Sequence, residues 1–369
     1  MRPVTFHHPH AQRRSVSLSL FTIARAHPHT VRRAFLAPLV SAVLMGLASA
    51  GGDGALAAAD EPQPATLVRS IGSDTMGGLM RRWAAGLRVY APKISLAVES
   101  RGSVTGPPAL IRGESDLAPM SRQMNPLEIT AFEKRYGYKP VFIRVALDAL
   151  AVYVHKDNPI QGLTLQQVDG IFSSTRRCGG RAFERWGDLI FGSLSDTPIA
   201  VVGRNTISGT YDYFRDSALC GGEFRSGYVE LEGSVAVVDT VGSSLGTIGF
   251  AGIGFRTSTV RALPLAKWES GAYVAYYSER HRDDPDLTKR YEPVTSGRYP
   301  LSRFLYVYVN KPPGKALPEA VEVALRYVLS ERGQKDVADN GFVPLPQRML
   351  RAERAKLAPG YQPSWWSGE

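Results

Sequence analysis

The sequence contains few of the residues that bind metal ions. Its 369 residues include two cysteines and seven histidines, and five of those histidines lie within residues 1–59. Only His155 and His281 follow, which are too few for a histidine cluster. We therefore predict a protein without a metal site, and we expect no other cofactor.

Long apolar segments are also absent beyond residue 59, since no run there reaches the roughly 18 residues that a membrane-spanning helix requires. A shorter apolar run follows Arg32 and Arg33, is interrupted by glycine and proline, and leads to small residues that end at Ala59-Asp60. Such a segment is typical of an export signal. We predict that residues 1–59 form this signal and that it is cleaved near Ala59-Asp60. The paired arginines leave the general and the twin-arginine export routes both open.

Acidic residues are outnumbered, and the formal net charge is +10. Six arginines and one aspartate lie in residues 1–59, so half of this excess belongs to the predicted signal. The remaining chain is only mildly basic and contains no block of positive charge. This distribution does not indicate a nucleic-acid partner.

The two cysteines, Cys178 and Cys220, each precede a pair of glycines and lie far from the predicted cleavage point. An even number of cysteines in an exported chain favours a disulfide. We predict that Cys178 and Cys220 pair, with two unpaired thiols as the alternative.

Strand-like and helix-like segments alternate after the predicted signal, which favours an α/β fold with parallel sheets and crossover helices. Residues 141–154 are apolar and β-branched and are interrupted by Asp148, so they predict a long strand that crosses between domains. The other predicted strands are residues 66–71, 94–99, 117–120, 198–202, 247–253, 260–265 and 304–309. The predicted helices are residues 76–90, 107–112, 126–136, 165–172, 209–219, 235–241 and 317–329.

Four turns are rich in glycine, serine and threonine: residues 72–75, 102–106, 120–122 and 204–210. At least three of them connect a strand to a helix, where free backbone N–H groups and the positive helix end are available to an anion. Any one such turn is more often a simple helix cap. Four together, two of them with an arginine that could hold an oxyanion by two parallel hydrogen bonds, predict an anion site.

In order and spacing, these segments resemble the PstS-like phosphate-binding proteins of bacterial ABC transporters, within the periplasmic-binding superfamily. The Arg-x-x-x-Ser-Gly-Thr pattern of residues 204–210 is the most specific part of the resemblance. The matching segments are Gly72-Ser-Asp-Thr-Met76, Gly102-Ser-Val-Thr-Gly106, Asp116-Leu-Ala-Pro-Met-Ser-Arg122, Ala149-Leu-Ala-Val-Tyr-Val154 with Asp157-Asn-Pro159, Gly203-Arg204 with Ser208-Gly-Thr210, and Gly249-Phe-Ala-Gly-Ile-Gly254.

The resemblance implies a two-lobed α/β fold of the type II periplasmic-binding class, with a discontinuous first lobe and a two-segment hinge. We expect residues 66–147 plus 263–345 in the first lobe, residues 149–261 in the second, and residues 346–369 as a C-terminal tail. Residues 147–152 and 255–265 would form the hinge. A ligand that bonds to both lobes at once would drive their closure.

The resemblance also implies a phosphate site. Arg204 matches the arginine of the family, Ser208, Gly209 and Thr210 match its donors at a helix start, and Ser103 matches the serine of the second turn. Ser73 and Thr75 supply the hydroxyls of the first turn, where either Asp74 or Thr75 takes the ligand-facing place. Ser121 completes the predicted ligand set. Members of the family carry an aspartate at the position of Arg122, and this aspartate accepts the proton of hydrogen phosphate and excludes sulfate. We expect Asp74 to accept this proton and Arg122 to act as a second cation. If Asp74 points elsewhere, selectivity for phosphate is not expected.

Together with the predicted export signal, the resemblance implies a periplasmic protein that captures inorganic phosphate for the permease of an ABC importer, acts as a monomer and is not an enzyme. The alternatives are a phosphate sensor or receptor that does not transport, a binder of another oxyanion, and a phosphatase. The phosphatase is disfavoured because neither His155 nor His281 lies in a candidate turn, where it could activate a serine.

Overall fold

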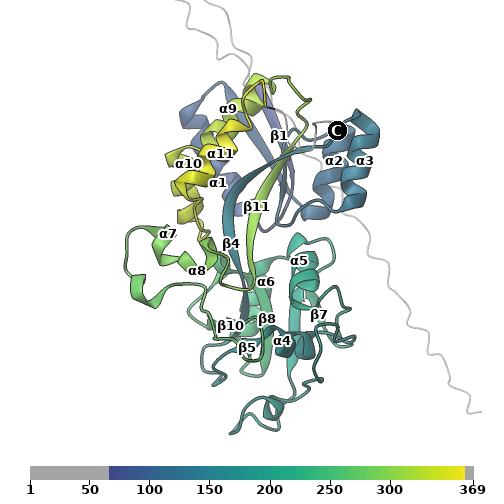
Figure 1. Cartoon of the computed structure of the whole chain (residues 1–369), viewed down its shortest axis with the longest axis vertical. Helices are drawn as coiled ribbons and strands as arrows, with labels where there is room; N and C mark the ends of the chain where they lie inside the picture. Colours follow the sequence, from purple (N-terminus) through teal and green to yellow (C-terminus); the bar gives the residue numbers. More distant parts are fainter. Residues whose placement is uncertain (1–65, 362–369) are drawn as a thin grey trace, which may run out of the picture. The chain divides into compact units, whose positions relative to one another are not determined.

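The computed structural model describes residues 66–361 (Figure 1). The export signal predicted for residues 1–59, and its cleavage point, lie outside this range. Within it, no helix combines the length and the apolar composition needed to cross a membrane.

The first lobe begins with a strand, a helix and a parallel strand, as the sequence predicts. Strands β1 (Thr66–Gly72) and β2 (Ile94–Ser100) pair in parallel, and helix α1 (Gly77–Tyr90) connects them. The helix buries residues at helical spacing, among them Leu79 and Trp83, and the Trp83 indole N–H donates to the Gly333 carbonyl at 2.9 Å. The apolar stripe therefore packs against the first lobe's own core.

Strand β4 (Val141–His155) links the two halves of the main sheet, whose order is β3-β11-β4-β8-β6-β7. Its first half pairs antiparallel with β11 (Ser302–Val309), and its second half pairs antiparallel with β8 (Thr247–Gly252) and β9 (Val260–Ala262). Every residue from Val145 to Val154 is buried. A strand covered on both faces is nearly continuous in apolar residues, which explains the pattern that predicted it.

The second lobe combines parallel pairs with the antiparallel pairs of β4. Strand β6 (Ala200–Arg204) is parallel to both β8 and β7 (Val229–Leu231). The sheets therefore contain the predicted parallel pairs, and the main sheet is mixed because β4 and β11 run antiparallel to their neighbours. Helix α4 (Leu165–Phe172) begins at the predicted cap, where Thr164 Oγ1 accepts from the Gln167 N–H at 3.1 Å.

The second connection between the lobes lies later in the chain than residues 255–265. Strand β9 still pairs with the far end of β4, and β10 (Leu265–Ala266) pairs with β5 (Leu163–Thr164). The chain joins the sheet of the first lobe only at β11, where Ser302 lies opposite Ala149. Residues 260–266, on both sides of the boundary predicted at residue 263, therefore pair with β4 and β5 and not with the sheet of the first lobe. Short apolar strands carry no signal for the sheet with which they pair.

Three helices follow β11 and complete the first lobe: α9 (Glu319–Val328), α10 (Glu331–Asp339) and α11 (Gln347–Ala355) (Figure 1). Glu353 of α11 is fully buried and accepts from Arg144 Nε at 2.5 Å. The C-terminal tail predicted from residue 346 therefore starts with a packed helix. The sequence did not predict this helix because most of its residues are polar. Residues 362–369 lie outside the described range.

The other elements are short, apart from helix α3, which begins at a capping box made by Asn125 and Glu128. Their bounds are η1 (Ser103–Thr105), α2 (Gly106–Arg112), β3 (Ala118–Met120), α3 (Pro126–Tyr136), η2 (Trp186–Asp188), α5 (Gly209–Ala218), α6 (Ser234–Gly242), η3 (Ile253–Phe255), η4 (Glu279–His281), α7 (Leu287–Arg290) and α8 (Glu292–Thr295).

Candidate functional site

The four turns predicted from the sequence lie together in the structure. Thr75 Oγ1, in the turn after β1, lies 2.9 Å from Thr210 Oγ1 in the first turn of α5. Ser103 Oγ, at the start of η1, lies 3.2 Å from Ser121 Oγ, which follows β3. We call the nine residues that meet here the polar cluster: Ser73, Asp74, Thr75, Ser103, Ser121, Arg204, Ser208, Gly209 and Thr210.

Almost all of this polar cluster is withdrawn from solvent. Its six serines and threonines, and Arg204, are at most 2% exposed. A hydroxyl has one hydrogen and two lone pairs, so hydroxyls that bond to one another keep capacity for a further partner. The cluster brings together the turn after β1 and the first turn of α5, which are 135 positions apart in the chain.

Helix α5 directs its N-terminus at the polar cluster. Ser208 caps the helix and accepts from the Thr210 N–H at 3.2 Å. A Cβ atom on Gly209 would lie 2.4 Å from Ser103 Oγ and 2.7 Å from Ser121 Oγ, so only glycine fits between these hydroxyls. The first N–H groups of a helix have no partner within it. The geometry thus places amide donors and hydroxyls at one point.

Ser73 occupies the corresponding position after β1. It is fully buried, its N–H donates to the Pro119 carbonyl at 2.7 Å, and its Oγ accepts from the Met76 N–H at 3.4 Å. These contacts hold the first turn against the strand that carries Ser121.

Arg204 supplies the positive charge of the polar cluster. It is fully buried at the end of β6, donates from Nη1 to Ser234 Oγ at 3.0 Å, and forms an ion pair through Nη2 with Asp74 of the opposite lobe. Its Nε is buried without a hydrogen-bond partner. Burial lowers the pKa of Arg204, and the charge of Asp74 offsets part of that effect. An oxyanion that bonded to the arginine would satisfy a donor that the protein itself leaves unpaired.

Arg122 does not belong to the polar cluster. Glu128 accepts from both terminal nitrogens at 2.7 and 2.8 Å, and Asp212 accepts from Nε at 2.7 Å. Burial lowers the pKa of Arg122, but the hydrogen bonds and charges of Glu128 and Asp212 outweigh it and raise the pKa overall. The guanidinium of Arg122 is thus engaged by two carboxylates in this structure, and its role as a second cation for the ligand stays a prediction.

Another arginine borders the polar cluster and was not predicted. Arg303, at the start of β11, donates from Nη2 to Thr210 Oγ1 at 3.0 Å and to Asp148 Oδ2 at 2.7 Å. Both charged side chains are almost completely buried. Arg303 and Thr210 are far apart in the chain, so their contact has no local signal in the sequence. The sequence offers only a charged residue within each of two apolar strands.

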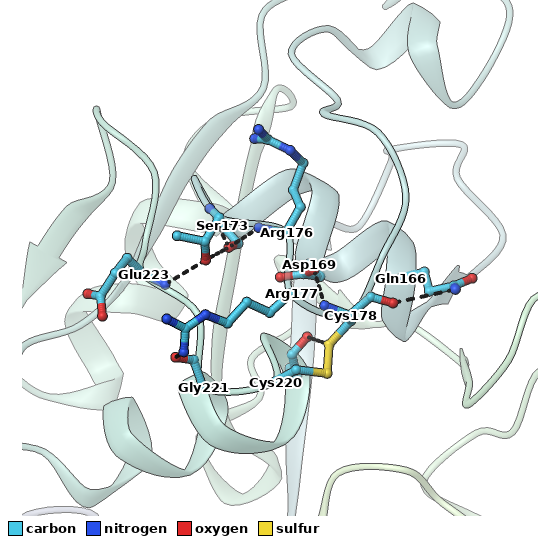
Figure 2. Close-up of a disulfide and its surroundings, with 11 residues drawn as sticks. Gln166, Asp169, Ser173, Arg176, Arg177, Cys178, Cys220, Gly221 and Glu223 are labelled. Carbon is cyan, nitrogen blue, oxygen red and sulfur yellow. Dashed lines mark hydrogen bonds between the residues drawn. A yellow bond between two sulfur atoms is a disulfide. The ribbon is translucent and has the colours of Figure 1, made fainter.

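Cys178 and Cys220 form a disulfide, as Figure 2 shows. The bond connects the loop after α4 to the residues just beyond the C-terminal end of α5. The Cys178 N–H donates to the buried Asp169 carboxylate at 2.8 Å. The disulfide thus anchors the helix whose opposite end faces the polar cluster.

Between residues 66 and 361, no three histidine, cysteine or acidic side chains lie close enough together to hold a metal ion. The chemistry offered by the polar cluster is therefore that of hydrogen-bond donors, one guanidinium and one carboxylate. Such a set suits a small oxyanion that carries a proton: donors surround its oxygens, and the carboxylate accepts its hydrogen.

Comparisons with known proteins agree with this chemistry. Residues 57–332 match the family model of the PBP superfamily domain. Over 327 residues the chain is 45% identical to the phosphate-binding protein PstS of Pseudomonas aeruginosa, covering 86% of this chain and 97% of that protein. It is 27% identical over 290 residues to the protein SphX of Synechococcus elongatus, covering 78% of this chain and 80% of that one.

A solved structure gives the same fold. The ABC-type phosphate transport receptor of Vibrio cholerae is similar with a TM-score of 0.57 and 21% identity, over 76% of this chain and all of that one. At this identity the likeness concerns the fold alone. It supports the two-lobed α/β architecture predicted from the sequence.

Proposed function

The chain belongs to the PBP superfamily and to its PstS-like phosphate-binding proteins, and on this premise we propose that it captures inorganic phosphate in the polar cluster and delivers it to an ABC importer. The observation that carries this proposal is the contact of buried hydroxyls from both lobes around Arg204. A ligand that bonds to both sides stabilises the closed arrangement, which is the state a transporter can recognise.

Each part of the polar cluster has a role in this proposal. Arg204 neutralises the anion, and its Nε and Nη2 donate to two phosphate oxygens. The α5 N-terminus with Gly209 and Thr210, together with Thr75, Ser103 and Ser121, donates to the remaining oxygens. Ser73 and Ser208 hold the turns that present these donors.

Asp74 gives the site its preference for a protonated anion. Its carboxylate is 19% exposed and is paired with Arg204, so it lies beside the atoms that would bind the ligand. Hydrogen phosphate can donate its proton to this carboxylate, whereas sulfate has none to give and meets a negative charge. The ligand would replace the direct ion pair between Asp74 and Arg204 and would contact both side chains.

In the cell, we propose an exported, periplasmic protein that acts as a monomer and hands phosphate to the permease of the importer. A sensor that binds phosphate without transport is the second candidate, because it would need the same site. Deletion of the gene distinguishes them: loss of phosphate uptake supports the importer, and normal uptake with an altered phosphate response supports the sensor.

Calorimetry on the exported protein, freed of bound anions, tests the proposal. Phosphate and arsenate should bind with one site per chain, and sulfate should bind far more weakly, because only the first two carry a proton at neutral pH. Equal binding of sulfate would reject selectivity for phosphate, and no binding of any of the three would reject the site. Release of phosphate from a phosphomonoester by the same sample would instead support an enzyme.

A further inference from the structure

Arg303 occupies the crossing of the two strands that connect the lobes. Its Cα partner in the antiparallel pair of β11 and β4 is Asp148, and both side chains are at most 2% exposed. Arg303 Nε and Nη2 donate to Asp148 Oδ2 at 3.0 and 2.7 Å. This pair is therefore a fixed, neutral unit at the point where the lobes would pivot.

The remaining donors of Arg303 reach toward the polar cluster. Nη1 donates to the Ser121 carbonyl at 3.1 Å, on the side of the first lobe, and Nη2 donates to Thr210 Oγ1 at 3.0 Å, on the side of the second. One side chain at the crossing thus contacts a cluster residue from each lobe. The lone pairs of the Ser121 carbonyl would repel an anion, but this carbonyl accepts a hydrogen bond from Arg303.

The bond to Thr210 has only one possible direction. A guanidinium has donors and no acceptor, so Thr210 Oγ1 must accept from Arg303, and its single hydrogen must be donated elsewhere. Thr75 Oγ1 lies 2.9 Å away in the polar cluster. Either oxygen of that pair could be the donor, but Arg303 occupies one lone pair of Thr210 Oγ1 in both cases and leaves the Thr210 hydrogen to be donated within the cluster.

The neighbourhood of Asp148 keeps this arrangement rigid. Asp148 Oδ1 accepts from the Ile253 N–H at 3.3 Å, and a Cβ on Gly252 would lie 2.9 Å from Asp148 Oδ2. The charge of Arg303 also lowers the pKa of Arg204, after the larger effect of burial, so its positive potential reaches the centre of the cluster.

We propose that Arg303 is a positioning residue of the phosphate site: it holds the Thr210 hydroxyl as a donor toward the ligand and ties that donor, through Asp148, to the crossing strands. The inference rests on the proposed function, because the ligand is the anion proposed there. Arg303 acts through Thr210, so its importance for binding should depend on the Thr210 hydroxyl.

A double-mutant cycle measured by phosphate calorimetry tests this dependence. Arg303→Met in the otherwise unchanged protein should weaken phosphate binding by roughly 10- to 100-fold, the range for a lost hydrogen bond to a charged group. In a Thr210→Val background the same change should weaken binding by less than about threefold, because the hydroxyl that Arg303 directs is already missing. Equal losses in both backgrounds would overturn the inference.

A second variant separates positioning from folding. Replacing the whole pair, in the double variant Asp148→Leu with Arg303→Met, removes both charges and should keep cooperative unfolding, since neutral replacements of a buried ion pair are tolerated. If this variant folds with weakened phosphate binding, positioning is supported; if it folds with unchanged affinity, the inference is overturned.

Arg256→Met is the matched control, because Arg256 is an exposed arginine outside the polar cluster and its substitution should leave affinity unchanged. An equal loss of affinity in this control would show that the effect of Arg303→Met is not specific, and would overturn the inference. If the unaltered protein binds no phosphate, the proposed function fails first. If it binds phosphate and the cycle is additive, only the role of Arg303 fails.

Discussion

Two buried arginine–aspartate pairs lie within one network of this protein, and they differ in how completely they are satisfied. Arg303 uses Nε, Nη1 and Nη2 as donors, and its partner Asp148 is fully buried. Arg204 is equally buried, yet its Nε has no partner, and Asp74 remains 19% exposed.

The difference separates a pair that maintains the fold from a pair that can change partners. A buried charge with all of its donors engaged has nothing to gain from a ligand, so removal of its partner only leaves an uncompensated charge. A buried charge with one free donor and a partly hydrated counter-ion can accept a new anion at low cost. The comparison predicts that the Arg303–Asp148 pair governs stability and affects binding only through Thr210, whereas the Arg204–Asp74 pair contacts the ligand directly.

The largest effect is expected for Asp148→Ala. This change leaves the Arg303 guanidinium buried without a carboxylate, and we expect a loss of about 3–5 kcal/mol in the free energy of unfolding. Urea denaturation followed by circular dichroism measures it. Asp157→Ala removes an exposed aspartate and should change stability by less than about 0.5 kcal/mol. A small loss for Asp148→Ala would remove the distinction between the two pairs.

Arg204→Ala should act on the ligand instead. We expect phosphate binding to weaken by about 2 kcal/mol or more, within the range of roughly 1.5–3 kcal/mol for a hydrogen bond to a charged group. The loss of stability without ligand should be smaller than for Asp148→Ala, because the freed Asp74 can be hydrated. Calorimetry and urea denaturation on the same sample check both statements. Unchanged affinity would exclude Arg204 from the site.

Asp74→Asn sharpens the comparison further, because it keeps the shape of the side chain and removes its charge. The amide both donates and accepts, so it no longer repels an unprotonated anion. We expect the difference between the binding free energies of phosphate and sulfate to shrink by about 1 kcal/mol or more. This follows from the penalty of about 1–3 kcal/mol for an unmade buried hydrogen bond. Competition calorimetry measures this difference. An unaltered difference would place the proton acceptor elsewhere.

Local sequence signals predicted much of the fold and of the polar cluster. The apolar stripe of α1, the capping residue Thr164 and the long, β-branched apolar run of β4 each determine their own element, so these predictions are confirmed. The four turns could be recognised because the N-terminus of a helix and its hydroxyl cap are close in sequence.

Long-range pairing was not accessible in the same way. Arg303 contacts Thr210 across 93 positions, and nothing near either residue indicates the other. The strands β9 and β10 are too short for their pattern to select a sheet. Arg122 lies in a recognisable turn, but the direction of its side chain depends on Asp212, 90 positions away.

The smallest effect on binding is therefore expected for Arg122→Met. Arg122 is 8% exposed and joins Glu128 to Asp212, a residue of the opposite lobe, so its removal weakens one bridge between the lobes and no direct bond to the ligand. Because Arg122 makes no direct bond to the ligand, phosphate affinity should fall by at most about threefold, which is less than about 1 kcal/mol. Calorimetry beside Arg204→Ala measures the contrast. A loss as large as that of Arg204→Ala would mean that Arg122 releases a carboxylate and turns to the phosphate on binding, and the division between fully paired and incompletely paired arginines would no longer identify the ligand site.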